Sequence, residues 1–149
     1  MINLTWKEIE EQSIKIAKKI KKDYQPDAIV GISSGGLIPT VIISKMLKIK
    51  KIGVFTVSSY ENKKQKKQQI LSKPKIDLKD KKVLLIDDIC DTGNTLDYVK
   101  KELLTKYKCK EIRIAVLVIN QEHTKKENYP KYYYKKIKDW IHFPWEINE

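Results

Sequence analysis

Two adjacent carboxylates follow an apolar run in the stretch VLLIDDICDTGNTL, residues 83–96. If this run is a buried strand, Asp87 and Asp88 stand at its carboxyl end, where doubly wound sheets bind ligands. The small and hydroxyl residues at 91–95 would then open a helix, and the free N–H groups at a helix start bind anions. Two acids repel a nearby phosphate unless they face hydroxyl groups or a divalent cation. A phosphorylated ribose with magnesium meets these requirements.

A second stretch, VGISSGGLIP at residues 30–39, has two chemical interpretations. Gly31, Ser33 and Gly35 fit the G-x-S-x-G pattern that places a nucleophilic serine on a strand-to-helix turn. The same small residues would let backbone N–H groups surround a phosphate at a helix start. The sequence pattern alone leaves both interpretations open.

Strands and helices alternate along most of the chain, as judged by the period of the apolar residues. Helices are predicted at 5–22, at 36–49 and from Thr95 onward, and strands at 27–33, 50–60, 81–87 and 111–119. This order implies an α/β fold with a mostly parallel central sheet flanked by helices.

Two segments break this alternation. The lysine-rich residues 61–75 show neither period, and we expect a mobile loop that is long enough to act as a lid. The aromatic C-terminal tail is expected to form a small appendage on the sheet, with one short strand around 137–142.

Composition limits the class of protein. The 149 residues are expected to form a single domain, 1–149, and no apolar run approaches the ~20 residues that span a bilayer. Cys90 and Cys109 lack the spacing of a zinc site or a disulfide framework. Free thiols are typical of a reducing compartment, so we expect a cytoplasmic location and no membrane partner.

The net charge of +12 raises the possibility of a nucleic-acid partner. However, Arg113 is the only arginine among 31 basic residues, and specific recognition of bases and phosphates depends largely on arginine. The composition therefore argues against nucleic acid as the main partner, although a lysine-rich surface would speed the arrival of a polyanionic small substrate.

The acidic stretch closely resembles the binding signature of type I phosphoribosyltransferases, with two acids after an apolar strand and then D-T-G-x-T. GISSGGLIP resembles the pyrophosphate loop of that family, and the segment 58–75, which begins with SSY, resembles its flexible catalytic loop. DWIHFPWE, within the tail 121–149, is similar to the base-binding hood of the small xanthine-guanine branch. The resemblance covers most of residues 27–146.

The resemblance also implies roles for individual residues. It assigns ribose and 5-phosphate binding to Asp87, Asp88, Asp91, Thr92, Gly93, Asn94 and Thr95; pyrophosphate binding to Ser33, Ser34, Gly35 and Lys66; and base binding to Asn120, Trp140, Ile141 and Glu146. Asp91 is the candidate general base or acid, and Lys66 is the catalytic cation of the loop. Asp87, Asp88 and Glu146 are the candidate Mg²⁺ ligands.

The implied reaction transfers a 5-phosphoribosyl group from phosphoribosyl pyrophosphate to a purine base, with xanthine, guanine or hypoxanthine expected. The products would be a nucleoside monophosphate and pyrophosphate, as in purine salvage. The resemblance also implies Mg²⁺ as cofactor and a homo-oligomer, either a dimer or a tetramer.

Two residues depart from the family pattern. Ser34 stands where related enzymes often carry an arginine, which removes one cation from the pyrophosphate side. Asn120 stands where purine enzymes of this branch usually have a lysine that binds the 6-oxo group. Because an asparagine amide both donates and accepts hydrogen bonds, Asn120 leaves the choice between a 6-oxo and a 6-amino purine open.

Two alternative functions compete with the enzyme. Some proteins with the phosphoribosyltransferase fold are regulators that bind RNA or DNA, and the basic surface permits this. The order Ser33, an aspartate, then His123 or His142 also matches that of a hydrolase triad. The short chain and the otherwise unexplained acidic stretch argue against the hydrolase.

Overall fold

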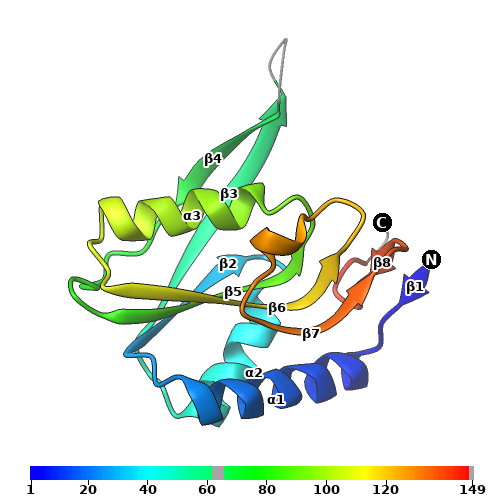
Figure 1. The fold of residues 1–149 in the computed structure, drawn as a ribbon, viewed down its shortest axis with the longest axis horizontal. Coiled ribbons are helices and arrows are strands. Elements are labelled where there is room, and N and C mark those ends of the chain that lie inside the picture. The colour runs from blue at the N-terminus through cyan, green and yellow to red at the C-terminus, as the bar shows by residue number, and fades with distance from the viewer. Residues whose placement is uncertain (62–65, 148–149) are drawn as a thin grey trace.

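The computed structural model describes residues 1–61 and 66–147 of the chain (Figure 1). In chain order, its elements are β1 (Ile2–Asn3), α1 (Trp6–Asp23), β2 (Ala28–Ser33), α2 (Leu37–Leu47), β3 (Ile52–Glu61), β4 (Lys66–Ser72), β5 (Lys82–Cys90), α3 (Asn94–Thr105), β6 (Glu111–Asn120), the 3-10 helix η1 (Lys126–Asn128), β7 (Tyr132–Ile137) and β8 (Ile141–His142). The helices and strands predicted between residues 5 and 60 and between 81 and 119 are confirmed, with small shifts at their ends.

The central sheet has the strand order β4-β3-β2-β5-β6-β7, and every neighbouring pair except β3 and β4 is parallel. The strand β3 pairs with one edge of β2, and β5, which comes later in the chain, pairs with the other edge of β2. The order of the strands therefore reverses between β2 and β5. In open α/β sheets, ligands bind at the carboxyl ends of the strands beside such a reversal.

Helices cover both faces of the sheet, with α1 and α2 on one side and α3 on the other (Figure 1). The strand β5 is buried on both faces, which explains why its sequence is continuously apolar. Leu84 and Ile86 pack in the cluster with α1 and α2, while Val83 and Leu85 pack in the cluster with α3.

The first helix begins as the sequence predicts, with a capping box. The Thr5 hydroxyl accepts a hydrogen bond from the Glu8 N–H at 3.1 Å, and the Glu8 carboxylate accepts one from the Thr5 N–H at 3.2 Å. One face of α1 is buried; it comprises Ile9, Gln12, Ser13, Ile16, Ala17 and Ile20.

The prediction that residues 61–75 lack regular structure is wrong for residues 66–72, which form β4. This strand pairs antiparallel with β3 and extends as a hairpin beyond the sheet (Figure 1). Among residues 67–72 of β4, Gln68 and Ile70 are half-buried and the others are exposed. One of these two half-buried residues is a glutamine, so apolar and polar residues do not alternate along the segment. The sequence therefore does not indicate a strand here.

The tail also differs from the prediction of one short strand at 137–142. It contributes β7, which extends the central sheet parallel to β6, and β8, which pairs with β1 at the N-terminus. Three consecutive tyrosines, residues 132–134, begin β7, and aromatic residues favour strands. No helix within residues 1–61 and 66–147 is long and apolar enough to cross a membrane.

Candidate active site

The two motifs singled out in the sequence meet where the strand order reverses. Ser33 ends β2, and Asp87 and Asp88 lie near the end of the adjacent strand β5. A Cβ atom on Gly35 would overlap the carboxylate of Asp88. A Cβ on Gly36 would lie 2.8 Å from the carbonyl oxygen of Ile86 on β5, so the loop can pass this close to β5 only because residues 35 and 36 have no side chains.

The two acids interact directly near the end of β5, where Asp87 is buried and Asp88 is half-buried. Asp87 is only 9% exposed, and its Oδ1 accepts a hydrogen bond from the Asp88 N–H at 2.8 Å. Burial and the neighbouring Asp88 charge raise the pKa of Asp87. Burial also raises the pKa of Asp88, and the charge of Glu146 adds to this effect. The pair therefore favours partners that stabilise negative charge, such as hydroxyl groups or a cation.

The loop after β5 has the geometry of an anion site. Gly93 has a φ of 90°, a conformation that favours glycine, and α3 begins directly after it at Asn94. The first N–H groups of a helix have no carbonyl partner within that helix. The Thr92 hydroxyl accepts a hydrogen bond from the Asn94 N–H at 3.3 Å, which holds the turn.

The β3–β4 hairpin touches this loop. The Thr95 hydroxyl donates a hydrogen bond of 2.7 Å to Oε1 of Gln68 on β4, and Gln68 also bonds to Ser59 on β3. Lys66 is the first residue of β4, but its side chain is outside what the structure describes. Lys63 and Lys64, which belong to the same lysine-rich segment, lie outside the described residues.

Asp91 is linked to the end of the next strand. Its Oδ1 lies 2.6 Å from Nδ1 of His123, and this Nδ1 lies 3.3 Å from Nδ2 of Asn120. The buried Thr124 hydroxyl contacts the carbonyl oxygens of Cys90 and Asp91. These contacts hold the segment after β6 against the segment after β5.

The hood presents one large aromatic side chain to solvent. Trp140 is 66% exposed, whereas Ile141 is buried and Glu146 is half-buried. The carbonyl oxygens of Trp140 and His142 accept hydrogen bonds from β1 and its flank, so the intervening peptide groups of Ile141 point away from β1. The Phe143 and Trp145 rings stack at 4.8 Å and stiffen the hood.

The structure thus places Ser33, Asp87, Asp88 and Asn120 toward the carboxyl ends of the neighbouring parallel strands β2, β5 and β6, with Asp91 and the hood following β5 and β7. The side chain of Lys66 is not among the described ones. Sequence reasoning missed Gln68 and Thr124, and it considered His123 only for a hydrolase. The sequence carries no local signal for His123 and Thr124, because their contacts follow from the register between β5 and β6. Cys90 pairs in register with Ile119, so the polar residues at 120–124 must emerge beside Asp91.

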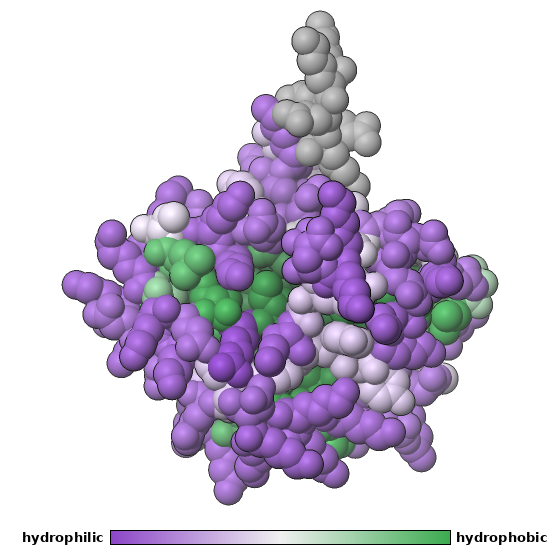
Figure 2. Space-filling view, viewed as in Figure 1, coloured by the Kyte–Doolittle hydropathy of each residue, from purple (hydrophilic) through white to green (hydrophobic). Residues whose placement is uncertain are grey.

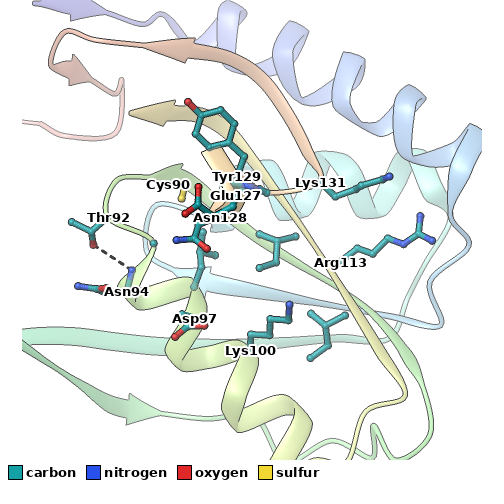
Figure 3. A pocket seen from close by; sticks show the side chains of 15 residues that line it. Cys90, Thr92, Asn94, Asp97, Lys100, Arg113, Glu127, Asn128, Tyr129 and Lys131 are labelled. Carbon is teal, nitrogen blue, oxygen red and sulfur yellow. Dashed lines mark hydrogen bonds between the residues drawn. The ribbon is translucent and has the colours of Figure 1, made fainter. Parts of the chain in front are cut away.

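A cavity of about 500 Å³ lies next to α3, adjoining the loop after β5 (Figure 3). Thr92, Gly93 and Asn94 form one wall, and Lys100, Arg113 and Lys131 line the part farther along β6. Asp87, Asp88, Asn120 and Trp140 do not line it. On the same side of the molecule, the surface is mostly hydrophilic, with apolar residues visible below α3 (Figure 2).

Comparison with known proteins identifies the family. A model of the phosphoribosyl transferase domain matches residues 4–148. The chain belongs to this family. A curated xanthine-guanine phosphoribosyltransferase of Idiomarina loihiensis is 28% identical over 147 residues, covering 97% of this chain and 86% of the relative.

Solved structures of phosphoribosyltransferases resemble the chain over nearly its whole length. The purine phosphoribosyltransferase of Pyrococcus horikoshii is 39% identical, with a TM-score of 0.86 over 97% of this chain and 93% of that chain. The xanthine-guanine-hypoxanthine phosphoribosyltransferase of Helicobacter pylori is 25% identical, with a TM-score of 0.81 over 98% of this chain and 94% of that chain. The predicted family and fold class are confirmed.

The hydrolase interpretation of Ser33 finds no support in this phosphoribosyltransferase. Oγ of Ser33 lies 2.6 Å from Oγ1 of Thr56, and His123 bonds to Asp91 instead. Among the described residues, no hydrogen bond joins Ser33 to a histidine.

Gly35→Ala tests the close packing of the two loops. Its Cβ would displace the Asp88 carboxylate, so we expect kcat/KM for phosphoribosyl transfer to fall at least about tenfold while the fold is kept. Gly53→Ala is the matched control, because its Cβ would meet side-chain carbons of Pro74 at 3.0 Å and of Ile76 at 3.5 Å near the other end of β3. Steady-state kinetics and circular dichroism measure both variants, and unchanged kinetics in Gly35→Ala would contradict the arrangement.

Proposed function

We propose that this phosphoribosyltransferase transfers the 5-phosphoribosyl group of phosphoribosyl pyrophosphate to a 6-oxopurine: xanthine, guanine or hypoxanthine. The products are a nucleoside monophosphate and pyrophosphate, as in purine salvage. The observation that carries this proposal is the acidic pair at the reversal of the strand order, packed against Gly35 and followed by the helix-start loop 91–95. The purine and xanthine-guanine enzymes among its relatives support the choice of base.

The 5-phosphate lies, in this proposal, against the N–H groups of residues 92–95. A helix start attracts a phosphate through its N–H groups and through the helix dipole. The Thr95 hydroxyl, now bonded to Gln68, is a further donor that the phosphate can recruit. The carboxylates of Asp87 and Asp88 then face the ribose hydroxyls, which donate hydrogen bonds to them.

The pyrophosphate lies next to the loop of Ser33, Ser34 and Gly35, whose N–H groups stabilise the charge that develops on the leaving group. Lys66 adds a cation when the hairpin closes over the site. Closure also keeps water from the anomeric carbon, where it would hydrolyse the substrate. The contact between Gln68 and Thr95 supports the hairpin as the closing element.

The site suits a cation that prefers oxygen ligands. Asp87 and Asp88, with Glu146 near enough to raise the pKa of Asp88, would hold Mg²⁺ directly or through the ribose hydroxyls. Within the described residues, no three His, Cys, Asp or Glu side chains are grouped to hold a metal ion. Mg²⁺ in proteins is usually bound by one or two carboxylates together with substrate phosphates and water. When bound, Mg²⁺ would neutralise charge on the departing pyrophosphate.

The purine lies between the loop after β5 and the hood. Trp140, which is largely exposed, stacks on the base, and the outward peptide groups of Ile141 contact its edge. Asp91 is the group that accepts the proton lost by the purine as the bond to ribose forms. A homo-oligomer, as a dimer or tetramer, and a cytoplasmic location complete the proposal.

A base panel tests this function. The purified protein, Mg²⁺ and phosphoribosyl pyrophosphate are incubated separately with hypoxanthine, guanine, xanthine, adenine and uracil, and pyrophosphate release is measured. We expect release with 6-oxopurines only. Absence of release with every base, together with salt-dependent binding to RNA, would instead favour a regulator.

A further inference from the structure

The side-chain amide of Gln68 lies between two hydroxyl groups. Its Oε1 accepts a hydrogen bond of 2.7 Å from the Thr95 hydroxyl, and its Nε2 donates one of 3.1 Å to Oγ of Ser59. Ser59 on β3 is the partner of Gln68 in the register of the hairpin, whereas Thr95 belongs to the first turn of α3. Among the described residues, no other side-chain hydrogen bond joins β4 to α3. Gln68 therefore connects the hairpin to the loop 91–95.

Two further contacts hold the hairpin without using the loop 91–95. Ile70 on β4 packs against the buried core on the α3 side of the sheet. Thr56, where β3 begins to pair with β4, is hydrogen-bonded through its hydroxyl to the last residue of β2. A ligand on the N–H groups of residues 92–95 would displace neither contact. The contact that such a ligand would affect is the bond between Gln68 and Thr95.

Either orientation of the Gln68 amide satisfies both of its hydroxyl partners, because a hydroxyl group can donate or accept. In the orientation described above, Thr95 gives its one hydroxyl proton to Oε1. After a half-turn of the amide, Nε2 would donate to Oγ1 of Thr95, and the Ser59 hydroxyl would donate to Oε1. Oγ of Ser59 lies 3.1 Å from Nε2 and 3.3 Å from Oε1, so it can bond to either amide atom. The reversed orientation leaves the Thr95 proton free for another acceptor.

A phosphate bound at the loop 91–95 would be such an acceptor. An ionised phosphate presents acceptor oxygens, so it bonds to Thr95 by taking the hydroxyl proton that Oε1 of Gln68 now accepts. The phosphate and the observed orientation of the amide therefore exclude each other. The phosphate and the reversed orientation are compatible, because Thr95 then accepts from Nε2 and donates to the phosphate.

We infer that Gln68 holds the hairpin on the loop 91–95 in both the empty and the loaded site, by reversing its hydrogen bond with Thr95 when the 5-phosphate binds. Gln68 is thus a positioning residue, which acts through Thr95 and touches no reacting atom. It keeps the start of β4, where Lys66 lies, next to this loop while the substrate is bound. This inference rests on the proposed function, which supplies the phosphate.

Gln68→Met is the first test, because methionine is of similar length but lacks the amide that bonds to Thr95. Amide hydrogen exchange of residues 67–72 is measured by mass spectrometry, with and without inosine 5′-monophosphate and Mg²⁺. We expect this exchange to be about fivefold faster than in the wild type under both conditions, the effect of one lost hydrogen bond on local opening. Gln69→Met is the matched control: Gln69 is exposed and pairs with Ser58, so exchange should stay at the wild-type level.

Three outcomes of the exchange experiment would overturn the inference. Faster exchange in Gln68→Met under only one of the two conditions would mean that the contact exists only in the empty or only in the loaded site. Wild-type exchange under both conditions would mean that the contact does not hold the hairpin. An equal effect of Gln69→Met would assign the change to the strand as a whole.

Gln68→Glu tests the reversal itself. A carboxylate only accepts hydrogen bonds, so it would keep the Thr95 proton and compete with the phosphate. The calorimetric Kd for inosine 5′-monophosphate should therefore rise at least about tenfold in Gln68→Glu, as expected for a hydrogen bond to a charged group. It should rise less than about threefold in Gln69→Glu, which adds the same charge one residue away on an exposed side chain.

A Thr95→Ala background separates this competition from simple charge repulsion. Because the background has no hydroxyl proton to compete for, Gln68→Glu should raise Kd less than about threefold there. An equal rise in both backgrounds, or no rise in Gln68→Glu alone, would exclude the reversal. If the wild type binds no nucleotide, the proposed function itself fails, so the two failures are distinguishable.

Discussion

Asp91→Asn is expected to lower kcat for phosphoribosyl transfer by about 10²–10⁴-fold, the usual contribution of a general base. The amide has the shape of the carboxylate but cannot accept the purine proton. The backbone N–H groups of the loop remain, so the KM for phosphoribosyl pyrophosphate should change little. Steady-state kinetics with hypoxanthine measures both constants.

The control for this prediction is Asp97→Asn, in the first turn of α3, the helix that follows Asp91. Asp97 forms an exposed ion pair with Lys101 at 3.3 Å and has no role in the proposed reaction. The Asp97→Asn variant should therefore retain the wild-type kcat. If Asp91→Asn also retained kcat within a few-fold, another group would have to accept the proton.

The double variant Asp87→Asn, Asp88→Asn should lose at least about 10²-fold in kcat/KM and become more stable to heat without ligand. Asp87 is buried next to the half-buried Asp88, and both pKa values are raised, so their charges destabilise the folded state. Removing them should raise the melting temperature by at least about 2 °C. Calorimetry and kinetics on the same preparation test the two effects together.

The change in folding stability with pH has a predictable direction. A raised pKa means that the folded protein binds these protons more tightly than the unfolded chain does. Stability should therefore decrease as pH rises above the ordinary aspartate value of 3.8, and this dependence should weaken in the double variant. A variant that melts earlier than the wild type at neutral pH would contradict the electrostatic account.

The parts of the site that the sequence predicts are local. Asp87 and Asp88 follow a strand that is recognisable from its apolar run, and residues 91–95 lie between that strand and the next helix. Gly93 has the positive φ that its position in the turn requires. These features depend on neighbours in the chain, so spacing and residue type were sufficient to predict the strand end and the start of the helix.

The parts that the sequence does not predict depend on long-range register. His123 approaches Asp91 only because β6 pairs with β5, and Gln68 approaches Thr95 only because β4 folds back on β3. A single histidine or glutamine in the sequence carries no sign of such a contact. The sequence analysis did not predict β7 because its three tyrosines stand in one run and its lysines in the next, so apolar and polar residues do not alternate.

The most direct test of the account is a crystal structure with inosine 5′-monophosphate and Mg²⁺. The account predicts the 5′-phosphate within about 3 Å of the N–H groups of residues 92–95, with the ribose hydroxyls facing Asp87 and Asp88. A phosphate bound elsewhere, for instance beside Lys100 and Lys131 in the cavity along α3, with no ligand at residues 92–95, would contradict it.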